Sequence, residues 1–156
     1  MAMDAEQRLK QPLLSAVIPF LNEEECIPAL IAELDDSLTQ LGIGFELVLV
    51  DDGSRDQSVA VAKEELRKRP QITATIISLS RNFGKEAALT AGLEAANGDV
   101  VVPLDADLQD PPSVIEGMLV RWRKGYDVVY AVRRQRAGES KTKRFTAYSF
   151  YRLMVV

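Results

Sequence analysis

Short apolar runs alternate along this chain with longer stretches in which apolar residues recur every three or four positions. The short runs lie at 15–20, 45–50, 72–79, 100–104 and 127–132. Apolar runs of this length are typical of buried β-strands. Polar, turn-forming residues follow the first four of them. The pattern therefore predicts five strands.

The longer stretches predict helices between these strands. Apolar residues from Ile27 to Leu41 recur at helical spacing, and Pro28 suits the first turn, where its missing N–H does no harm. Gly42 and Gly44 are expected to end this helix. Further helices are predicted over 56–69, over 87–96 and from 111 to 125.

Alternating strands and helices favour an α/β fold with a mostly parallel central sheet flanked by helices. The polar loops after the first four strands would then emerge at one edge of the sheet, where open α/β folds bind ligands. We divide the chain into a tail (1–12), a core (13–135) and a basic loop with the start of an amphipathic helix (136–156). Because that helical pattern is still apolar at Val156, we expect the domain to be cut short there.

Composition narrows the possible chemistry. The 156 residues include 19 Lys and Arg against 23 Asp and Glu, and the net charge of −4 argues against nucleic acid as a partner. The absence of histidine excludes Ser-His-Asp catalysis and His-ligated zinc. The single cysteine, Cys26, lies beside three glutamates, a poor setting for a thiolate, and is interpreted as structural. No secretory signal or membrane span is recognisable, so we expect a cytosolic location by default.

The run at 100–104 ends in two carboxylates, Asp105 and Asp107. Side chains two positions apart on an extended segment share a face, so both would point the same way from the end of a strand. The amide of Gln109 follows nearby. Hard oxygen ligands of this kind suit Mg²⁺ or Mn²⁺, shared with substrate phosphates. The alternative is a strand followed by an ordinary polar loop.

Two further loops carry candidate binding groups. Asp51 and Asp52 follow the second strand, where a carboxylate can accept a hydrogen bond from a nucleobase or a ribose, or can simply form a turn. Arg81, Gly84 and Lys85 lie at the start of a predicted helix. Cations at a helix N-terminus favour an anion site. The alternative is a pair of surface cations beside a flexible glycine.

The segment after the fifth predicted strand is basic, with six cations between Arg133 and Arg144. It could clamp a diphosphate, contact anionic lipid headgroups or form a solvated loop. Aromatic residues then recur from Phe145 to Tyr151, as in an interfacial amphipathic helix or in a core-facing helix of a larger domain.

Four motifs occur together in a fixed order along the chain. They are IPFLNE at 18–23, VDDGS at 50–54, RNFGK at 81–85 and DADLQDPP at 105–112. Together they resemble the inverting glycosyltransferases of family 2, which have the GT-A fold, a Rossmann-like α/β sandwich. The resemblance is closest to the polyprenyl-phosphate branch, which includes bactoprenol glucosyltransferases and dolichol-phosphate mannose synthase.

The resemblance implies roles for the residues of the first two motifs. Pro19, Asn22 and Glu23 would border the nucleotide. Asp51 would hold the base, and Asp52 would lie beside it.

The later motifs would bind the phosphates and the metal. Gly84 and Lys85 would face the diphosphate region. Asp105 and Asp107 would hold Mg²⁺ or Mn²⁺ with Gln109, and Asp105 would also contact the nucleotide. Arg133 would approach the phosphates. Asp105, Asp107 and Arg133 are therefore the residues to which the resemblance assigns catalysis.

The resemblance implies transfer of a hexose from a nucleotide sugar, with UDP favoured, to polyprenyl phosphate at the cytoplasmic face of the membrane. A lipid phosphate is already an anion and needs no strong base, so the missing histidine is no obstacle, while metal and cations would stabilise the leaving nucleoside diphosphate. Two alternatives stay open, a transferase with a soluble or polysaccharide acceptor and a non-catalytic module that binds nucleotide sugars. An exposed aromatic stripe could also favour homo-oligomers.

Overall fold

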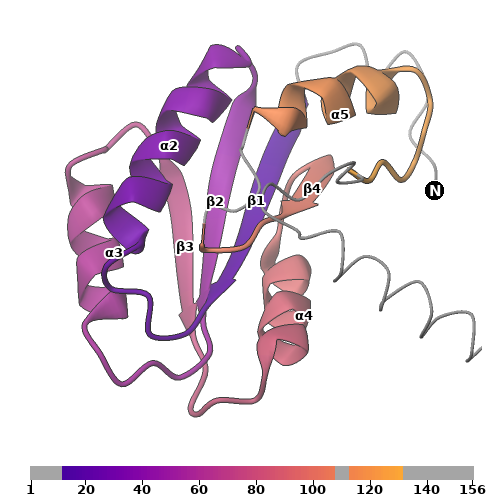
Figure 1. The fold of residues 1–156 in the computed structure, drawn as a ribbon. Helices are drawn as coiled ribbons and strands as arrows, with labels where there is room; N and C mark the ends of the chain where they lie inside the picture. The colour runs from indigo at the N-terminus through magenta and orange to yellow at the C-terminus, as the bar shows by residue number, and fades with distance from the viewer. Residues whose placement is uncertain (1–11, 108–112, 132–156) are drawn as a thin grey trace, which may run out of the picture.

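The computed structural model describes residues 12–107 and 113–131 (Figure 1). Strands and helices alternate throughout these residues, as predicted. In chain order the elements are β1 (Leu13–Phe20), α2 (Ile27–Gln40), β2 (Gly44–Asp51), α3 (Ser58–Arg67), β3 (Thr73–Ser78), α4 (Lys85–Ala95), β4 (Val100–Pro103) and α5 (Val114–Arg123).

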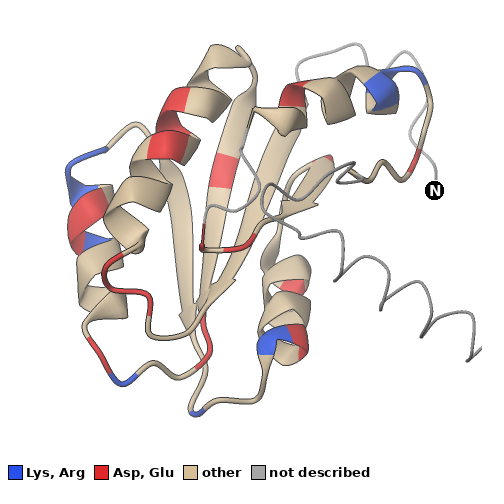
Figure 2. Ribbon diagram, in the orientation of Figure 1, with Lys and Arg blue, Asp and Glu red and all other residues tan. Residues whose placement is uncertain are grey.

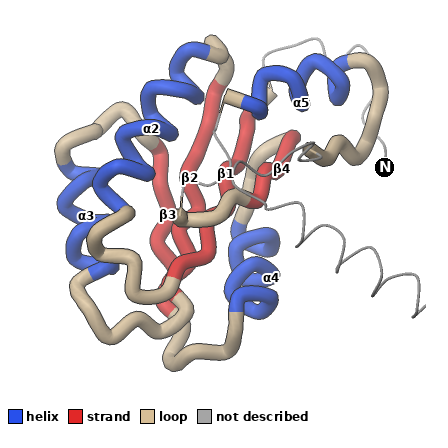
Figure 3. The backbone as a smooth tube through the Cα atoms, viewed as in Figure 1, coloured by secondary structure: helices blue, strands red, loops and turns tan. Residues whose placement is uncertain are grey.

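The four strands form one parallel sheet in the order β3-β2-β1-β4 (Figure 3). β1 lies in the middle and pairs with β2 along its whole length, from Leu13 opposite Gly44 to Phe20 opposite Asp51. The predicted parallel sheet is therefore confirmed. Because the strands are parallel, their carboxyl ends lie at the same edge, where the polar loops emerge.

Helices cover both faces of the sheet (Figure 1). Leu14, Ala16 and Ile18 of β1 share a core cluster with buried residues of α2, α3 and α5. Val17 points to the other face, where it packs in a second cluster with Ala88 of α4. Burial on both faces explains why β1 and β2 read as continuous apolar runs rather than as alternating patterns.

The first helix begins and ends close to its predicted limits. Pro28 lies in its first turn, as expected, and Gly42 follows the helix with a φ of 64°. Gly44, which was predicted to end the helix, is instead the first residue of β2, opposite Leu13. The strand extends that far because β1 offers a backbone partner there, a tertiary contact that local spacing does not reveal.

The fifth predicted strand, at 127–132, is wrong for the residues that the structure describes. Residues 127–131 form no strand, and the side chains of Val128 and Tyr130 are exposed. This segment faces β4 across a cavity of about 530 Å³ that α5 also lines. A strand needs a neighbouring backbone within hydrogen-bonding distance, and an apolar run alone does not supply one.

Several predicted features fall in 1–11, 108–112 and 132–156, outside the described residues. They include most of the N-terminal tail, the basic loop and the aromatic stripe. Within the described part of the chain, none of the helices has the length and apolar character needed to cross a bilayer.

Candidate functional site

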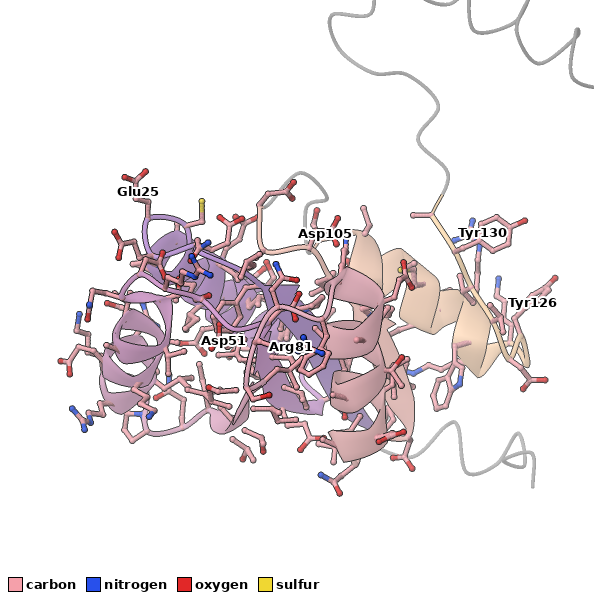
Figure 4. The ribbon with its side chains drawn as sticks, turned by 90° about the horizontal axis from the view of Figure 1, so that it is seen from below. Glu25, Asp51, Arg81, Asp105, Tyr126 and Tyr130 are labelled. Atoms are coloured by element: carbon pink, nitrogen blue, oxygen red, sulfur yellow. The ribbon has the colours of Figure 1, made fainter. Side chains whose placement is uncertain are left out.

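A cleft of about 280 Å³ opens at the carboxyl ends of β1, β2 and β4, beside the start of α4. Figure 4 looks onto this end of the sheet, with Asp51, Arg81 and Asp105 labelled. Most residues predicted for the site line this cleft, namely Pro19, Glu23, Asp52, Gly84, Lys85, Asp105 and Asp107. Loops that are far apart in the sequence therefore meet at one edge of the sheet, as the parallel arrangement requires.

Asp52 holds the loop between β3 and α4. Its Oδ1 accepts the backbone N–H of Phe83 at 2.8 Å, and its Oδ2 accepts that of Gly84 at 2.9 Å. The Oδ1 of Asn82 is a second acceptor for the Gly84 N–H, also at 2.9 Å. Asp52 is buried, and its own N–H donates to the carbonyl of Phe20. The carboxylate thus fixes the backbone that leads into α4.

Two glycines make this arrangement possible. Gly53 has a φ of 77°, and a Cβ there would lie 2.5 Å from the carbonyl carbon of Arg81. Gly84, which precedes the first residue of α4, has a φ of 98°, with open space around its missing Cβ. A positive φ strains residues that carry a Cβ. Gly53 is therefore required by close contact and by backbone conformation, and Gly84 by backbone conformation alone.

Asp51 and Asn22 lie beside the cleft without lining it. The Oδ1 of the buried Asp51 accepts the N–H of Ser54 at 2.8 Å. Asn22 has a φ of 54°; its N–H donates to the Ser54 hydroxyl, and its Oδ1 accepts the N–H of Arg55, both at 2.8 Å. Both side chains stabilise the loops after β1 and β2, and their contacts with a nucleotide remain predictions.

The same two loops are joined again near the starts of α2 and α3. The N–H of Glu23 donates to the Ser58 hydroxyl at 2.8 Å, and the N–H of Gln57 donates to the Glu24 carboxylate at 2.7 Å. Asp56 accepts the N–H of Glu24 at 3.2 Å. Desolvation acts to raise the pKa of Asp56, but hydrogen bonds from Ser58 outweigh it and hold the pKa below its ordinary value. These contacts fix the backbone at Glu23, on the wall of the cleft.

Lys85 and Asp105 form an ion pair across the cleft. The Lys85 Nζ lies 2.5 Å from the Asp105 Oδ1, and the two side chains are 60% and 48% exposed. Lys85 is the first residue of α4, whereas Asp105 follows β4. The register of β4 is set by pairing with β1 and by a hydrogen bond from the Leu104 N–H to the Val17 carbonyl. Two of the predicted binding residues are thus in direct contact.

Asp107 lies close enough to Cys26 to act on its thiol. A hydrogen bond with Glu23, desolvation and the negative charges of Glu23, Glu25 and Asp107 raise the pKa of Cys26. This agrees with the predicted poor setting for a thiolate.

Asp105 and Asp107 suit a divalent cation whose coordination a substrate would complete. They are carboxylates that line one cleft, and Mg²⁺ and Mn²⁺ prefer such oxygen ligands. Within 12–107 and 113–131, no three side chains of His, Cys, Asp or Glu gather as a metal site. The predicted ligand Gln109 and the predicted phosphate contact Arg133 lie outside the described residues.

Asn82 also lines the cleft, although no role was predicted for it. Its position inside the motif RNFGK was the available signal. Figure 2 shows the acidic residues of the loops at this end of the sheet. Among the described residues that line the cleft, four carboxylates accompany a single ammonium group, that of Lys85. The charges of these described residues, taken by themselves, disfavour an anionic ligand.

Comparison with known proteins gives concordant results. Residues 15–154 match the family described as Glycosyl transferase family 2. The chain is 44% identical over 124 residues to the undecaprenyl-phosphate 4-deoxy-4-formamido-L-arabinose transferase of Pseudomonas aeruginosa, covering 80% of this chain and 36% of that protein. It is 39% identical over 140 residues to the bactoprenol glucosyl transferase of Shigella phage SfV, covering 90% of this chain and 45% of that protein.

A solved structure supports the fold. The glucosyl-3-phosphoglycerate synthase of Mycobacterium tuberculosis, in complex with Mn²⁺, UDP and glucosyl-3-phosphoglycerate, matches with a TM-score of 0.58 and 27% identity, over 78% of this chain and 43% of that one. Together with the parallel sheet, this confirms the GT-A fold that the four motifs implied. The chain spans less than half the length of the curated relatives that it matches.

Proposed function

Because this chain belongs to glycosyl transferase family 2, we propose that it supplies the donor-binding part of an inverting transferase that moves a hexose from a nucleotide sugar to polyprenyl phosphate. The observation that carries the proposal is the cleft in which Asp105, Asp107 and Lys85 meet. The names of the two relatives, which give undecaprenyl phosphate and bactoprenol, support the acceptor. A UDP sugar is the favoured donor.

Each part of the cleft has a distinct task in this proposal. Asp105 and Asp107 would hold Mg²⁺ or Mn²⁺, which supplies Lewis-acid stabilisation of the leaving diphosphate when bound. Asp52 positions the backbone of Gly84, and Lys85 would contribute a positive charge beside the phosphates. Asp51, close to the turn after β2, would contact the base. The mycobacterial synthase was solved with Mn²⁺ and UDP, which supports a divalent metal and a nucleotide as ligands of this fold.

Titration calorimetry tests the donor site. UDP and GDP are titrated separately into the chain with Mn²⁺ and again with EDTA. We expect one nucleotide to bind much more tightly with Mn²⁺ than with EDTA, and Asp107→Asn to abolish that difference. The exposed Asp36→Asn on α2 is the matched control and should bind like the unchanged chain. Equal nucleotide affinity with and without Mn²⁺ would count against the proposal.

A soluble acceptor is the second candidate, because the mycobacterial synthase is named for a glucosylated phosphoglycerate. The two candidates predict different products from the same donor. A full-length relative is incubated with a radiolabelled nucleotide sugar and either undecaprenyl phosphate in detergent or 3-phosphoglycerate in buffer. Label that moves into the organic phase with undecaprenyl phosphate supports the lipid acceptor. Label that is transferred to 3-phosphoglycerate in the aqueous phase supports the second candidate. Binding of the donor without transfer to either acceptor and without hydrolysis would support the remaining alternative, a non-catalytic module that binds nucleotide sugars.

A further inference from the structure

The ion pair between Lys85 and Asp105 occupies the position where the proposed function needs a metal. Asp105 cannot offer the same oxygen fully to a divalent cation while the Lys85 Nζ lies 2.5 Å from its Oδ1. Two positive charges at that separation from one oxygen repel each other. A metal that enters the cleft must therefore displace Lys85 or bind more weakly beside it.

The backbone on both sides of the pair is held in place. Asp52 and Asn82 fix the N–H of Gly84, immediately before Lys85. On the other side, the N–H of Leu104, the residue immediately before Asp105, donates to the carbonyl of Val17. The side chains themselves remain about half exposed, so Lys85 can change partner while the backbone stays fixed.

The charges in the cleft make such an exchange favourable when the donor binds. Among the described lining residues, Lys85 carries the one positive charge against the carboxylates of Glu23, Asp52, Asp105 and Asp107. A diphosphate alone would be repelled by these carboxylates. A metal alone would meet the ammonium of Lys85. A metal that arrives with a diphosphate provides both a new cation for Asp105 and a new anion for Lys85.

We propose that Lys85 is an exchangeable counter-ion, paired with Asp105 in the free protein and released to the donor diphosphate as a divalent cation takes over the carboxylate. This inference rests on the proposed function and adds an order of events to it. Metal and nucleoside diphosphate bind together, and each binds weakly without the other. Such coupling is reciprocal for the two ligands.

Replacing the ammonium separates this role from a structural one. In Lys85→Met the affinity for Mn²⁺ without nucleotide rises about three- to tenfold, because the competing cation is gone. In the same variant the affinity for UDP in EDTA falls, because the diphosphate loses its cation. Lys85→Arg keeps the charge and stays within about twofold of the unchanged chain for both ligands. A residue that only maintained the fold would lower both affinities.

Mn²⁺ binding is measured from the decrease in the electron paramagnetic resonance signal of free Mn²⁺. UDP binding is measured by calorimetry. Lys63→Met, on the surface of α3 away from the cleft, corrects for the general loss of one positive charge. Circular dichroism melting checks that each variant folds. Unchanged or weaker Mn²⁺ binding in Lys85→Met overturns the proposal, as does the absence of Mn²⁺ binding in both proteins.

The two proposals fail in different ways. Suppose that Lys85→Met strengthens Mn²⁺ binding, but that neither UDP nor GDP binds to the unchanged chain or to any variant in the presence of Mn²⁺. The counter-ion role of Lys85 at Asp105 is then supported, and the proposed donor site is rejected. Suppose instead that a nucleotide binds in the presence of Mn²⁺, but that Lys85→Met does not change the affinity for Mn²⁺ in the absence of nucleotide. The donor site is then supported, and the proposed counter-ion exchange is rejected.

Discussion

Asp52 and Gly84, which lie 32 residues apart in the sequence, are joined by a hydrogen bond of 2.9 Å between a carboxylate oxygen and a backbone N–H. The other oxygen of Asp52 accepts the N–H of Phe83. This buried side chain therefore helps to determine where α4 begins and where Lys85 is presented to the cleft. The second aspartate of the motif VDDGS acts on protein backbone, and it can influence a ligand through the loop that it holds.

Asp52→Asn tests this role. Asparagine keeps one acceptor oxygen but turns an NH₂ group toward a backbone N–H, so one hydrogen bond is lost and a donor is left unsatisfied. We expect the free energy of unfolding to fall by about 1.5–3 kcal/mol, as for other bonds to charged acceptors. We also expect weaker nucleotide binding, because Gly84 and Lys85 shift. Urea unfolding and calorimetry measure the two effects.

Asp99→Asn is the matched control for Asp52→Asn. Among the described residues Asp99 accepts one hydrogen bond, from the N–H of Leu13 to its Oδ2, at an exposed position. Asparagine can keep that bond, so the free energy of unfolding should change by less than about 1 kcal/mol. Equal losses in the two variants would show that the double contact of Asp52 has no special weight.

Gly53→Ala probes the contact between the turn after β2 and the loop before α4. The new Cβ would lie 2.5 Å from the carbonyl carbon of Arg81, in a residue whose φ is 77°. We expect a loss of roughly 2–5 kcal/mol, from overpacking together with left-handed strain. Gly42→Ala separates the two terms, because Gly42 has a φ of 64° with nothing within 4 Å of the new Cβ. Thermal unfolding should show a smaller loss for Gly42→Ala, and a reversed order would contradict the interpretation.

Gly92→Ala probes the packing of α4 on the sheet. Alanine favours a helix interior over glycine by about 1 kcal/mol. At Gly92, however, a Cβ would lie 2.4 Å from Cγ1 of Val17 and 3.0 Å from Cγ2 of Val50. We expect net destabilisation of about 1–3 kcal/mol, because the overlap outweighs the gain in propensity. Urea unfolding provides the measurement.

Gly117→Ala is the control for Gly92→Ala. Gly117 also lies inside a helix, α5, but a Cβ there would meet only the far end of the Arg121 side chain, at 3.8 Å. Alanine should therefore stabilise the protein by roughly 0.5–1 kcal/mol. If Gly92→Ala is also stabilising, α4 does not lie as close to β1 as the structure places it.

The strands and helices around the sheet could be predicted because their apolar residues are buried in regular patterns. The convergence of Asp52, Lys85 and Asp105 on one cleft could be predicted as well, since it follows from parallel strands. The bonds from Asp52 to backbone amides could not, because spacing along the chain does not show which acceptors meet which donors. The prediction of a strand at 127–132 was wrong for a related reason. An apolar run indicates burial, but it does not identify the backbone with which a strand would pair.

Glu46 belongs to a buried network at the opposite end of the sheet, which the sequence pattern also did not reveal. Its Oε1 accepts hydrogen bonds from the Ser15 hydroxyl at 2.6 Å and from the Asn97 N–H at 2.7 Å. The Ser15 hydroxyl in turn accepts the N–H of Gly98 at 2.8 Å. The network joins β1, β2 and the loop before β4, so it helps to set the register of the strand that leads to Asp105.

Glu46 should make the stability of the protein depend on pH. Burial acts to raise the pKa of Glu46, but the hydrogen bonds from Ser15 and Asn97 outweigh it, so the pKa is held below its ordinary value. A depressed pKa stabilises the fold above the unfolded-state value of about 4.3, and this stability is lost as the pH falls through the lower folded-state value.

Glu46→Gln should therefore be about 1–3 kcal/mol less stable than the unchanged chain at pH 7, with the difference shrinking between about pH 5 and pH 3. Urea unfolding at stepped pH measures this, with the exposed Glu94→Gln as the baseline for removing one carboxylate. A difference that stays constant across that range would mean that the network does not act through the charge of Glu46.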